Sequence, residues 1–90
     1  MKLIFRLHAI RRMFERAITV DDVAKVFMDG KVIEDRPGEY PYQSSLWLGY
    51  AGNRPLHVAV ADNEDAHERV VITGYEPDPT QWTSDSITRT

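Results

Sequence analysis

Ninety residues suffice for one hydrophobic core, so the chain is expected to form a single domain, placed at residues 1–79, with a C-terminal tail at 80–90. Hydrophobic residues make up 42% of the chain and charged residues 28%, a balance that excludes a disordered protein. Because the chain has no cysteine and its N-terminal apolar run, residues 3–5, is too short for a signal peptide or a membrane span, a cytoplasmic protein without disulfides is expected.

The net charge of −3 argues against a domain that binds nucleic acid over its whole surface. The average hides an asymmetry, because residues 1–18 carry five basic side chains and one acidic side chain, whereas residues 61–85 carry seven carboxylates and one arginine. The N-terminal end is therefore locally basic. This charge either serves binding or belongs to an ordinary solvated face.

The first predicted helix spans residues 6–17. Apolar residues recur three and four positions apart, which predicts one inward-facing stripe made of Ala9, Ile10, Met13, Phe14 and Ala17. His8, Arg12 and Arg16 follow one another at four-residue intervals on the opposite side. We call this row the ridge and expect it to be exposed or to face a cleft.

A second helix is predicted to begin after Thr19, a good N-cap residue that is followed by acidic residues in the first helical turn. Gly30 is placed to end this helix. Its apolar stripe consists of Val23, Val26 and Phe27. A β-branched run at 31–35 then predicts an edge strand, and residues 39–44 are expected to be irregular.

Three further strands are predicted at residues 45–50, 56–61 and 69–75, joined as consecutive hairpins by the turn formers Gly52-Asn53 and by residues 62–65. The expected fold is thus α+β, with two N-terminal helices packed on a four-stranded, mostly antiparallel sheet. In the middle hairpin strand, alternation directs Leu56, Val58 and Val60 toward the helices.

His57 is expected on the other face of the sheet. A loop centred near Asp65 would place it opposite Thr73, with Tyr75 diagonal to it on the same face. The tail from Glu76 onward is expected to be irregular and to be held by Trp82.

Histidine, arginine and tyrosine suffice for metal-free RNA cleavage, in which the 2′-hydroxyl needs a base, the phosphate needs cations and the departing oxygen needs an acid. The chain offers His8 or His57, then Arg12, Arg16 or Arg54, and Tyr75. Each has a plainer explanation: His8 in helix packing, His57 as a half-buried histidine bonded to Thr73, and the arginines in surface ion pairs. His67 is expected to be a solvated loop residue.

No metal or cofactor is expected. The histidines lack metal-ligand spacing, the acidic loop at 62–68 lacks the glycine and the spaced ligands of a calcium loop, and the glycines form no phosphate-binding pattern.

Six stretches together resemble the bacterial and archaeal family of domains of unknown function 4258 (DUF4258). They are His8-Ala9-x-x-Arg12-Met13-x-x-Arg16-x-Ile18, Asp22-Val23, Gly30-x-Val32-Ile33, Leu48-Gly49, Arg54-Pro55-Leu56-His57-Val58 and the stretch from Ile72 to Pro79. The resemblance implies a toxin fold of the RelE or BrnT type, mRNA cleavage as the activity, and a zinc-ribbon or helix-turn-helix antitoxin as partner. The family positions that carry over are His8, Arg12, Arg16, Arg54, His57, Thr73 and Tyr75.

The leading hypothesis is therefore a metal-independent endoribonuclease, the toxin of a type II toxin–antitoxin pair. Its catalytic candidates are His8, Arg12, Arg16, His57 and Tyr75, and its substrate-binding candidates are Arg54 and Thr73. The alternative is a non-catalytic protein-binding module that uses the ridge and the edge strand at 31–35. A third hypothesis is a homodimeric small-molecule binder whose pocket is lined by Trp47, Tyr50 and Trp82.

Overall fold

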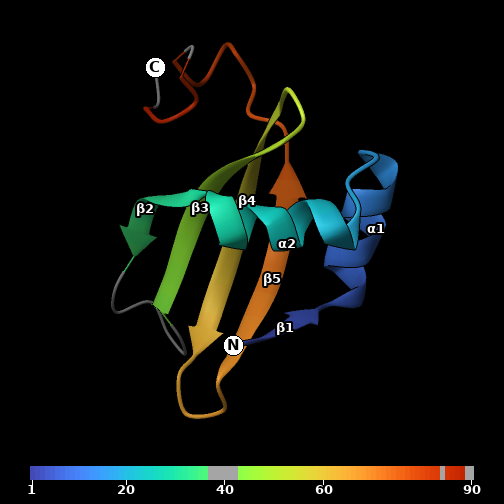
Figure 1. Cartoon of the computed structure of the whole chain (residues 1–90), viewed down its shortest axis with the longest axis vertical. Coiled ribbons are helices and arrows are strands. Elements are labelled where there is room, and N and C mark those ends of the chain that lie inside the picture. Colours follow the sequence, from blue (N-terminus) through green and yellow to red (C-terminus); the bar gives the residue numbers. More distant parts are fainter. Residues whose placement is uncertain (37–42, 84, 89–90) are drawn as a thin grey trace.

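A five-stranded sheet forms the centre of the computed structural model, which describes residues 1–36, 43–83 and 85–88 (Figure 1). Helix α2 crosses one face of the sheet, and α1 stands beside β5 (Figure 1). The strand order is β1-β5-β4-β3-β2. In chain order the elements are β1 (Lys2–Phe5), α1 (Leu7–Glu15), α2 (Val20–Asp29), β2 (Lys31–Arg36), β3 (Gln43–Ala51), β4 (Arg54–Asn63) and β5 (Glu68–Tyr75).

The α+β class and the two helices are confirmed, but the expected number of strands is wrong. Lys2–Phe5 forms β1, which pairs in parallel with the first half of β5, from Lys2 opposite Glu68 to Phe5 opposite Val71. Local pattern could not predict this strand, because four residues show little alternation and their partners lie more than sixty positions along the chain.

Helix α1 buries a narrower stripe than expected. Ala9 and Met13 are buried, whereas Ile10 is 38% exposed and Phe14 is 85% exposed. Ala17 is exposed as well, so the prediction that Ile10, Phe14 and Ala17 face inward is wrong. The physical reason is the position of α1 beside β5, where the sheet covers only one side of the helix.

The α1–α2 corner is built by two local motifs. The Ile18 N–H donates to the Met13 carbonyl (2.9 Å) and the Ala17 N–H to the Phe14 carbonyl (3.2 Å), a Schellman motif that holds Ala17 at φ +54°. Thr19 then caps α2 as predicted: its hydroxyl accepts from the Asp22 N–H, and Asp22 accepts from the Thr19 N–H, both at 3.0 Å.

Helix α2 lies very close to β3. Val23 and Val26 are fully buried, and a Cβ atom added at Gly49 would stand only 2.8 Å from the Cα of Val26. Gly30 ends α2 as predicted, with φ −88°. A Cβ at Gly30 would stand 2.4 Å from the carbonyl oxygens of Val26 and Leu48, so close approach rather than left-handed backbone explains the glycine.

The hairpins agree with the prediction in outline. Ala51 pairs with Arg54 across Gly52-Asn53, and Gly52 has φ +63°. Strand β2 lies at an edge of the sheet, as expected. Residues 43 and 44, predicted to be irregular, belong to β3, and the rest of that prediction, residues 39–42, lies outside the described residues.

The two faces of β4 separate as predicted. Leu56, Val58 and Val60 join the core with residues of both helices. His57 points to the other face, where cross-strand pairing sets Tyr75, His57, Leu48 and Lys31 in one row across four strands. The predicted register is wrong: His57 lies opposite Tyr75, and Thr73 lies opposite Ala59. The loop is centred slightly later than expected, and a bulge at Ala59/Val60 adds a further shift.

The C-terminal tail is held by Trp82, as predicted, because this side chain is only 4% exposed. Within the described ranges no helix is long and apolar enough to cross a membrane.

Candidate functional site

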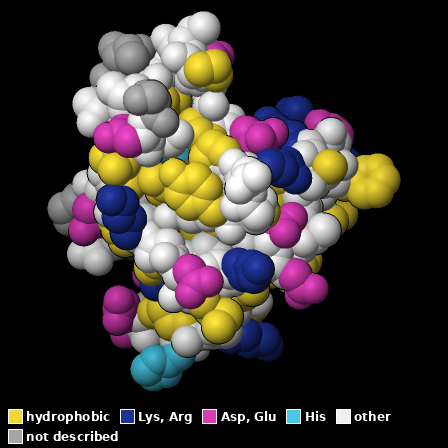
Figure 2. All heavy atoms as spheres, turned by 45° about the horizontal axis from the view of Figure 1, so that its top comes forward, with side chains coloured by type: hydrophobic (Ala, Val, Ile, Leu, Met, Phe, Trp, Pro, Cys, Tyr) yellow, Lys and Arg dark blue, Asp and Glu magenta, His cyan; other side chains and the backbone are white. Residues whose placement is uncertain are grey.

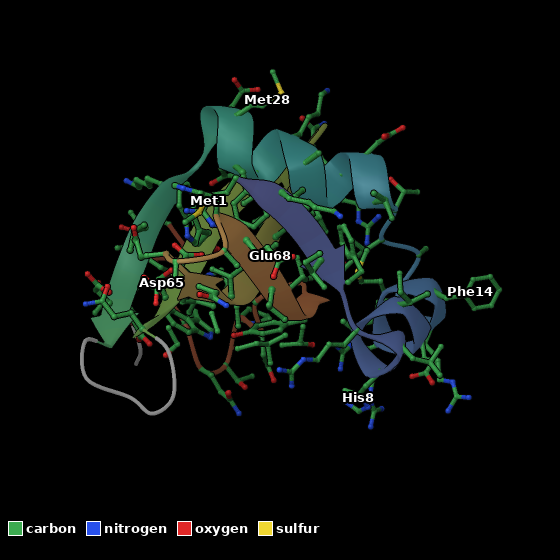
Figure 3. The ribbon with its side chains drawn as sticks, turned by 90° about the horizontal axis from the view of Figure 1, so that it is seen from below. Met1, His8, Phe14, Met28, Asp65 and Glu68 are labelled. Atoms are coloured by element: carbon green, nitrogen blue, oxygen red, sulfur yellow. The ribbon has the colours of Figure 1, made fainter. Side chains whose placement is uncertain are left out.

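The ridge on α1 is exposed at all three of its positions, as predicted. His8 points to the side of the sheet opposite α2 (Figure 3). Among the residues that the structure describes, Arg12 makes only a long ion pair with Glu15 (Nη1 to Oε2, 3.5 Å), and an exposed pair of this kind holds a side chain weakly. Helical rise separates the Cα atoms of successive ridge residues by about 6 Å.

Arg16, the third ridge residue, turns its guanidinium toward β5. Its Nη1 donates to the Gly74 carbonyl (2.9 Å) and to the Thr73 hydroxyl (3.2 Å). Strand β1 pairs with β5 only as far as Val71. Beyond that point, Arg16 donates a hydrogen bond to the Gly74 carbonyl of β5, a backbone acceptor that β1 does not reach. The two contacts use at most two of the five guanidinium donors.

Arg54 reaches the same corner from the start of β4. Its Nη1 donates to the Ala17 carbonyl (2.8 Å) and its Nη2 to the Arg16 carbonyl (3.0 Å), so a cation caps the C-terminal end of α1 where the helix dipole favours positive charge. Its Nε also lies 3.5 Å from Glu76 Oε1. The structure thus brings Arg16, Arg54 and Thr73 together.

His57 and Tyr75 form a second group, in which the tail covers the His57 ring. The His57 ring is fully buried, and it meets the rings of Tyr75 and Trp82 edge-on at centroid distances of 5.4 and 4.3 Å. Its Nε2 lies 2.7 Å from the Ser86 carbonyl oxygen. Because a carbonyl oxygen can only accept a hydrogen bond, Nε2 must carry the proton and donate it. The expected hydrogen bond partner was Thr73, which instead lies opposite Ala59 and bonds Arg16.

The predicted constellation is therefore divided. The ridge and the His57 face of the sheet lie on the same side of the molecule, away from α2, but the tail covers His57 and leaves His8 and Arg12 open. His8 and Arg16 are eight residues apart on α1, about 12 Å along the helix axis. The structure thus brings Arg16 to Arg54 and Thr73, whereas the His57 ring is buried against Tyr75, Trp82 and the Ser86 carbonyl.

The predicted aromatic pocket does not form within a single chain. Trp47 lies on the face of α2, where its ring meets Phe27 edge-on at 5.1 Å, whereas Trp82 lies on the His57 face. The sheet separates the two tryptophans, so they cannot line one pocket. Within the described residues no group of three or more histidine, aspartate or glutamate side chains is placed to hold a metal ion.

One strong polar cluster was not predicted. Arg69 donates to both carboxylate oxygens of Asp62 (2.8 and 3.1 Å), and its guanidinium carbon lies 5.0 and 4.8 Å from the ring centres of Phe27 and Trp47. The pair was detectable, because Asp62 and Arg69 are nearly equidistant from the centre of their loop and so face each other across the hairpin.

These features define a small α+β domain with a basic helix, α1, beside β5, the last strand in chain order. The chain belongs to the DUF4258 family: the family described as "Domain of unknown function (DUF4258)" matches residues 5–76. Comparison with curated proteins and with solved structures found no match. The matched region ends at Glu76, before Trp82 and Ser86, the tail residues that cover His57.

Proposed function

We propose that this domain is a metal-independent endoribonuclease, the toxin of a type II toxin–antitoxin pair, and that RNA binds along the ridge. The observation that carries the proposal is the row of exposed cationic and titratable side chains on α1, which Arg54 joins at the C-terminal end. The fold-level resemblance to RelE and BrnT toxins remains part of this proposal.

The ridge suits the phosphates of one RNA strand. Guanidinium groups bind phosphate through paired N–H donors and stay charged at any pH of interest. Arg12 has only a weak ion pair to give up, and Arg16 retains donors beyond those it gives to Gly74 and Thr73. Arg12 and Arg16 would therefore stabilise negative charge that develops on the reacting phosphate.

His8 is the accessible acid–base group on this ridge. In the proposed reaction its neutral imidazole takes the proton from a 2′-hydroxyl, whose oxygen attacks the adjacent phosphorus to form a cyclic phosphate. The P–O5′ bond breaks, and the resulting imidazolium returns the proton to the departing 5′-oxygen. These proton transfers and the exchange of one P–O bond for another need no metal ion and no redox partner.

His57 and Tyr75 take a positioning role in this proposal. While the tail is docked, the His57 ring is fully buried against Trp82, and the Tyr75 ring packs edge-on against His57. They hold the end of β5, and through it Thr73 and Gly74, where Arg16 binds.

RNA cleavage by the purified chain in the presence of a chelator tests the proposal. His8→Asn should reduce the cleavage rate by a factor of about 10² or more, because it removes the general base and acid. His67→Asn is the matched control, since His67 lies in the exposed β4–β5 loop and asparagine tolerates its φ of +53°. Expression should arrest growth, and His8→Asn should relieve the arrest.

Cleavage that requires added metal, or that His8→Asn leaves unchanged in a folded protein, would contradict this assignment. An inhibitory partner of the zinc-ribbon or helix-turn-helix type is part of the proposal, and it should suppress cleavage by covering the ridge.

One observation favours a second function. The complete burial of His57 among Tyr75, Trp82 and the Ser86 carbonyl is the environment of a structural histidine, as expected in a non-catalytic protein-binding module. Such a module could extend the sheet at β2, an edge strand with Val32 exposed. A folded protein that leaves RNA intact under all conditions would favour this alternative.

A further inference from the structure

Helix α1 presents a second surface that the ridge does not use. Leu7, Ile10 and Phe14 are 66%, 38% and 85% exposed. Their spacing of three and four residues aligns them as one apolar stripe, which we call the outer face of α1. Phe14 points away from the rest of the molecule (Figure 3), and an apolar side chain stands clear of the surface at the edge that α1 forms (Figure 2).

Positive charge borders this stripe on both sides. Arg6 lies four positions before Ile10, and Arg11 lies four positions after Leu7 and three before Phe14, so helical geometry makes both of them neighbours of the stripe. In the part of the chain that the structure describes, neither arginine is held in an ion pair. Glu15, the one carboxylate of α1, pairs with Arg12 instead.

We propose that the outer face of α1 docks an acidic amphipathic helix of a partner protein. Side chains spaced at i, i+3 and i+7 fit the apolar face of another helix, and carboxylates beside that face would pair with Arg6 and Arg11. An exposed phenyl ring on a charged helix gains most from such a contact, because aromatic side chains bury large apolar area.

Two other occupants fit the surface less well. In a two-fold dimer the same outer face would meet itself, which brings Arg6 and Arg11 of both copies together with a single carboxylate, Glu15, from helix α1 of each copy. Single-stranded RNA stacks its bases on aromatic rings, but Leu7 and Ile10 have no ring to offer. The inference does not depend on ribonuclease activity, because the outer face and the ridge use different residues of α1.

Photo-crosslinking in the native host tests the surface directly. Benzoylphenylalanine at position 14 should crosslink to a segment of another protein that has apolar residues at helical spacing flanked by carboxylates. The same group at position 28 is the control, because Met28 is also strongly exposed (81%) but lies on α2 (Figure 3). Adducts only between copies of this chain, adducts only with RNA, or no adduct at position 14 would overturn the proposal.

A synthetic peptide of the crosslinked segment then tests the chemistry. Phe14→Ser and Arg11→Glu should each weaken its binding about tenfold or more, whereas Met28→Ser should leave the affinity unchanged. A peptide with lysine in place of its glutamates should regain affinity for Arg11→Glu. Binding indifferent to Phe14→Ser, or not restored by the charge exchange, would overturn the proposal. RNA cleavage by Phe14→Ser should match that of the parent chain, which separates docking from the proposed nuclease activity.

Discussion

Arg54 has a structural role at the end of α1, whether or not it also binds RNA. Its guanidinium satisfies the carbonyls of Arg16 and Ala17 at the end of α1, which would otherwise lack a partner at a helix terminus. If substitution of Arg54 abolished function, two causes would therefore be combined: the loss of a phosphate contact and the weaker attachment of α1. His8 and Arg12 are better probes of function, because both are exposed and neither holds two elements together.

Ala17 gives a prediction at the residue scale. Its φ of +54° is a left-handed conformation in which the alanine Cβ crowds the backbone. Ala17→Gly should therefore raise the free energy of unfolding by about 0.5–1 kcal/mol, measured by denaturant titration. Ala24→Gly, the same exchange within α2, should lower it by about 1 kcal/mol. If both variants lose stability equally, the left-handed cap is not strained.

At the scale of elements, the contact of α2 with β3 depends on a missing side chain. Gly49 lets the α2 backbone approach so closely that a Cβ would stand 2.8 Å from both Cα and Cγ2 of Val26. Gly49→Ala should therefore lower the free energy of unfolding by about 1–3 kcal/mol. Gly74→Ala should change it by less than about 0.5 kcal/mol, because a Cβ there meets its nearest atoms at 3.9 Å. Thermal unfolding of both variants measures the difference, and equal losses would contradict the close packing.

The tail should be sensitive to acid. The backbone N–H and then the hydroxyl of Thr80 donate to Asp78, and both bonds lower the pKa of its carboxyl below the ordinary 3.8. The Thr83 hydroxyl, and after it the Ile87 N–H, likewise lower the pKa of Asp85. Both carboxylates thus stabilise the turns of the tail above pH 3.8, and this contribution disappears as the pH falls through their lowered pKa values.

Nuclear magnetic resonance of the two tryptophan indoles can follow this transition. The Trp82 signal should change as the tail leaves His57, while the Trp47 signal, from an indole bonded to Ser45 on the other face, stays constant. Asp85→Asn should loosen the tail already at neutral pH. Simultaneous change of both indole signals would indicate general acid unfolding and contradict a separate tail transition.

Local chemistry explains which elements could be predicted. The Thr19 N-cap and the Gly52-Asn53 hairpin depend on residues within a few positions of each other, and both are confirmed. Strand β1 depends on a partner strand at the other end of the chain, and the His57–Tyr75 pairing depends on a bulge. The exposure of Phe14 depends on where α1 stands relative to the sheet, which periodicity cannot reveal.

In the candidate site, too, local features could be predicted from the sequence and tertiary contacts could not. The ridge follows from four-residue spacing on one helix, so its order was readable from the sequence. That Arg16 turns to Gly74 and that the tail buries His57 are tertiary contacts between residues 29 to 58 positions apart. Sequence alone therefore placed His57 on the correct face of the sheet but could not show what covers it.

Across the whole molecule, the ridge lies beside the last strand of the sheet, while acidic residues gather in the β4–β5 loop and in the tail. Acidic and basic side chains are interspersed over the face that carries α2 (Figure 2). An RNA strand should therefore approach from the side of α1 that His8 faces, where the basic side chains form a row.

Mapping the RNA contact by nuclear magnetic resonance tests this account most directly. The titrant is a single-stranded oligoribonucleotide with 2′-O-methyl groups, which binds but cannot be cleaved because its attacking hydroxyls are blocked. The account predicts that the largest shifts follow His8, Arg12 and Arg16, with smaller shifts at Arg54 and none in the loop around His67. Shifts centred on that loop or on β2, or no shifts at all, would contradict an RNA site on α1.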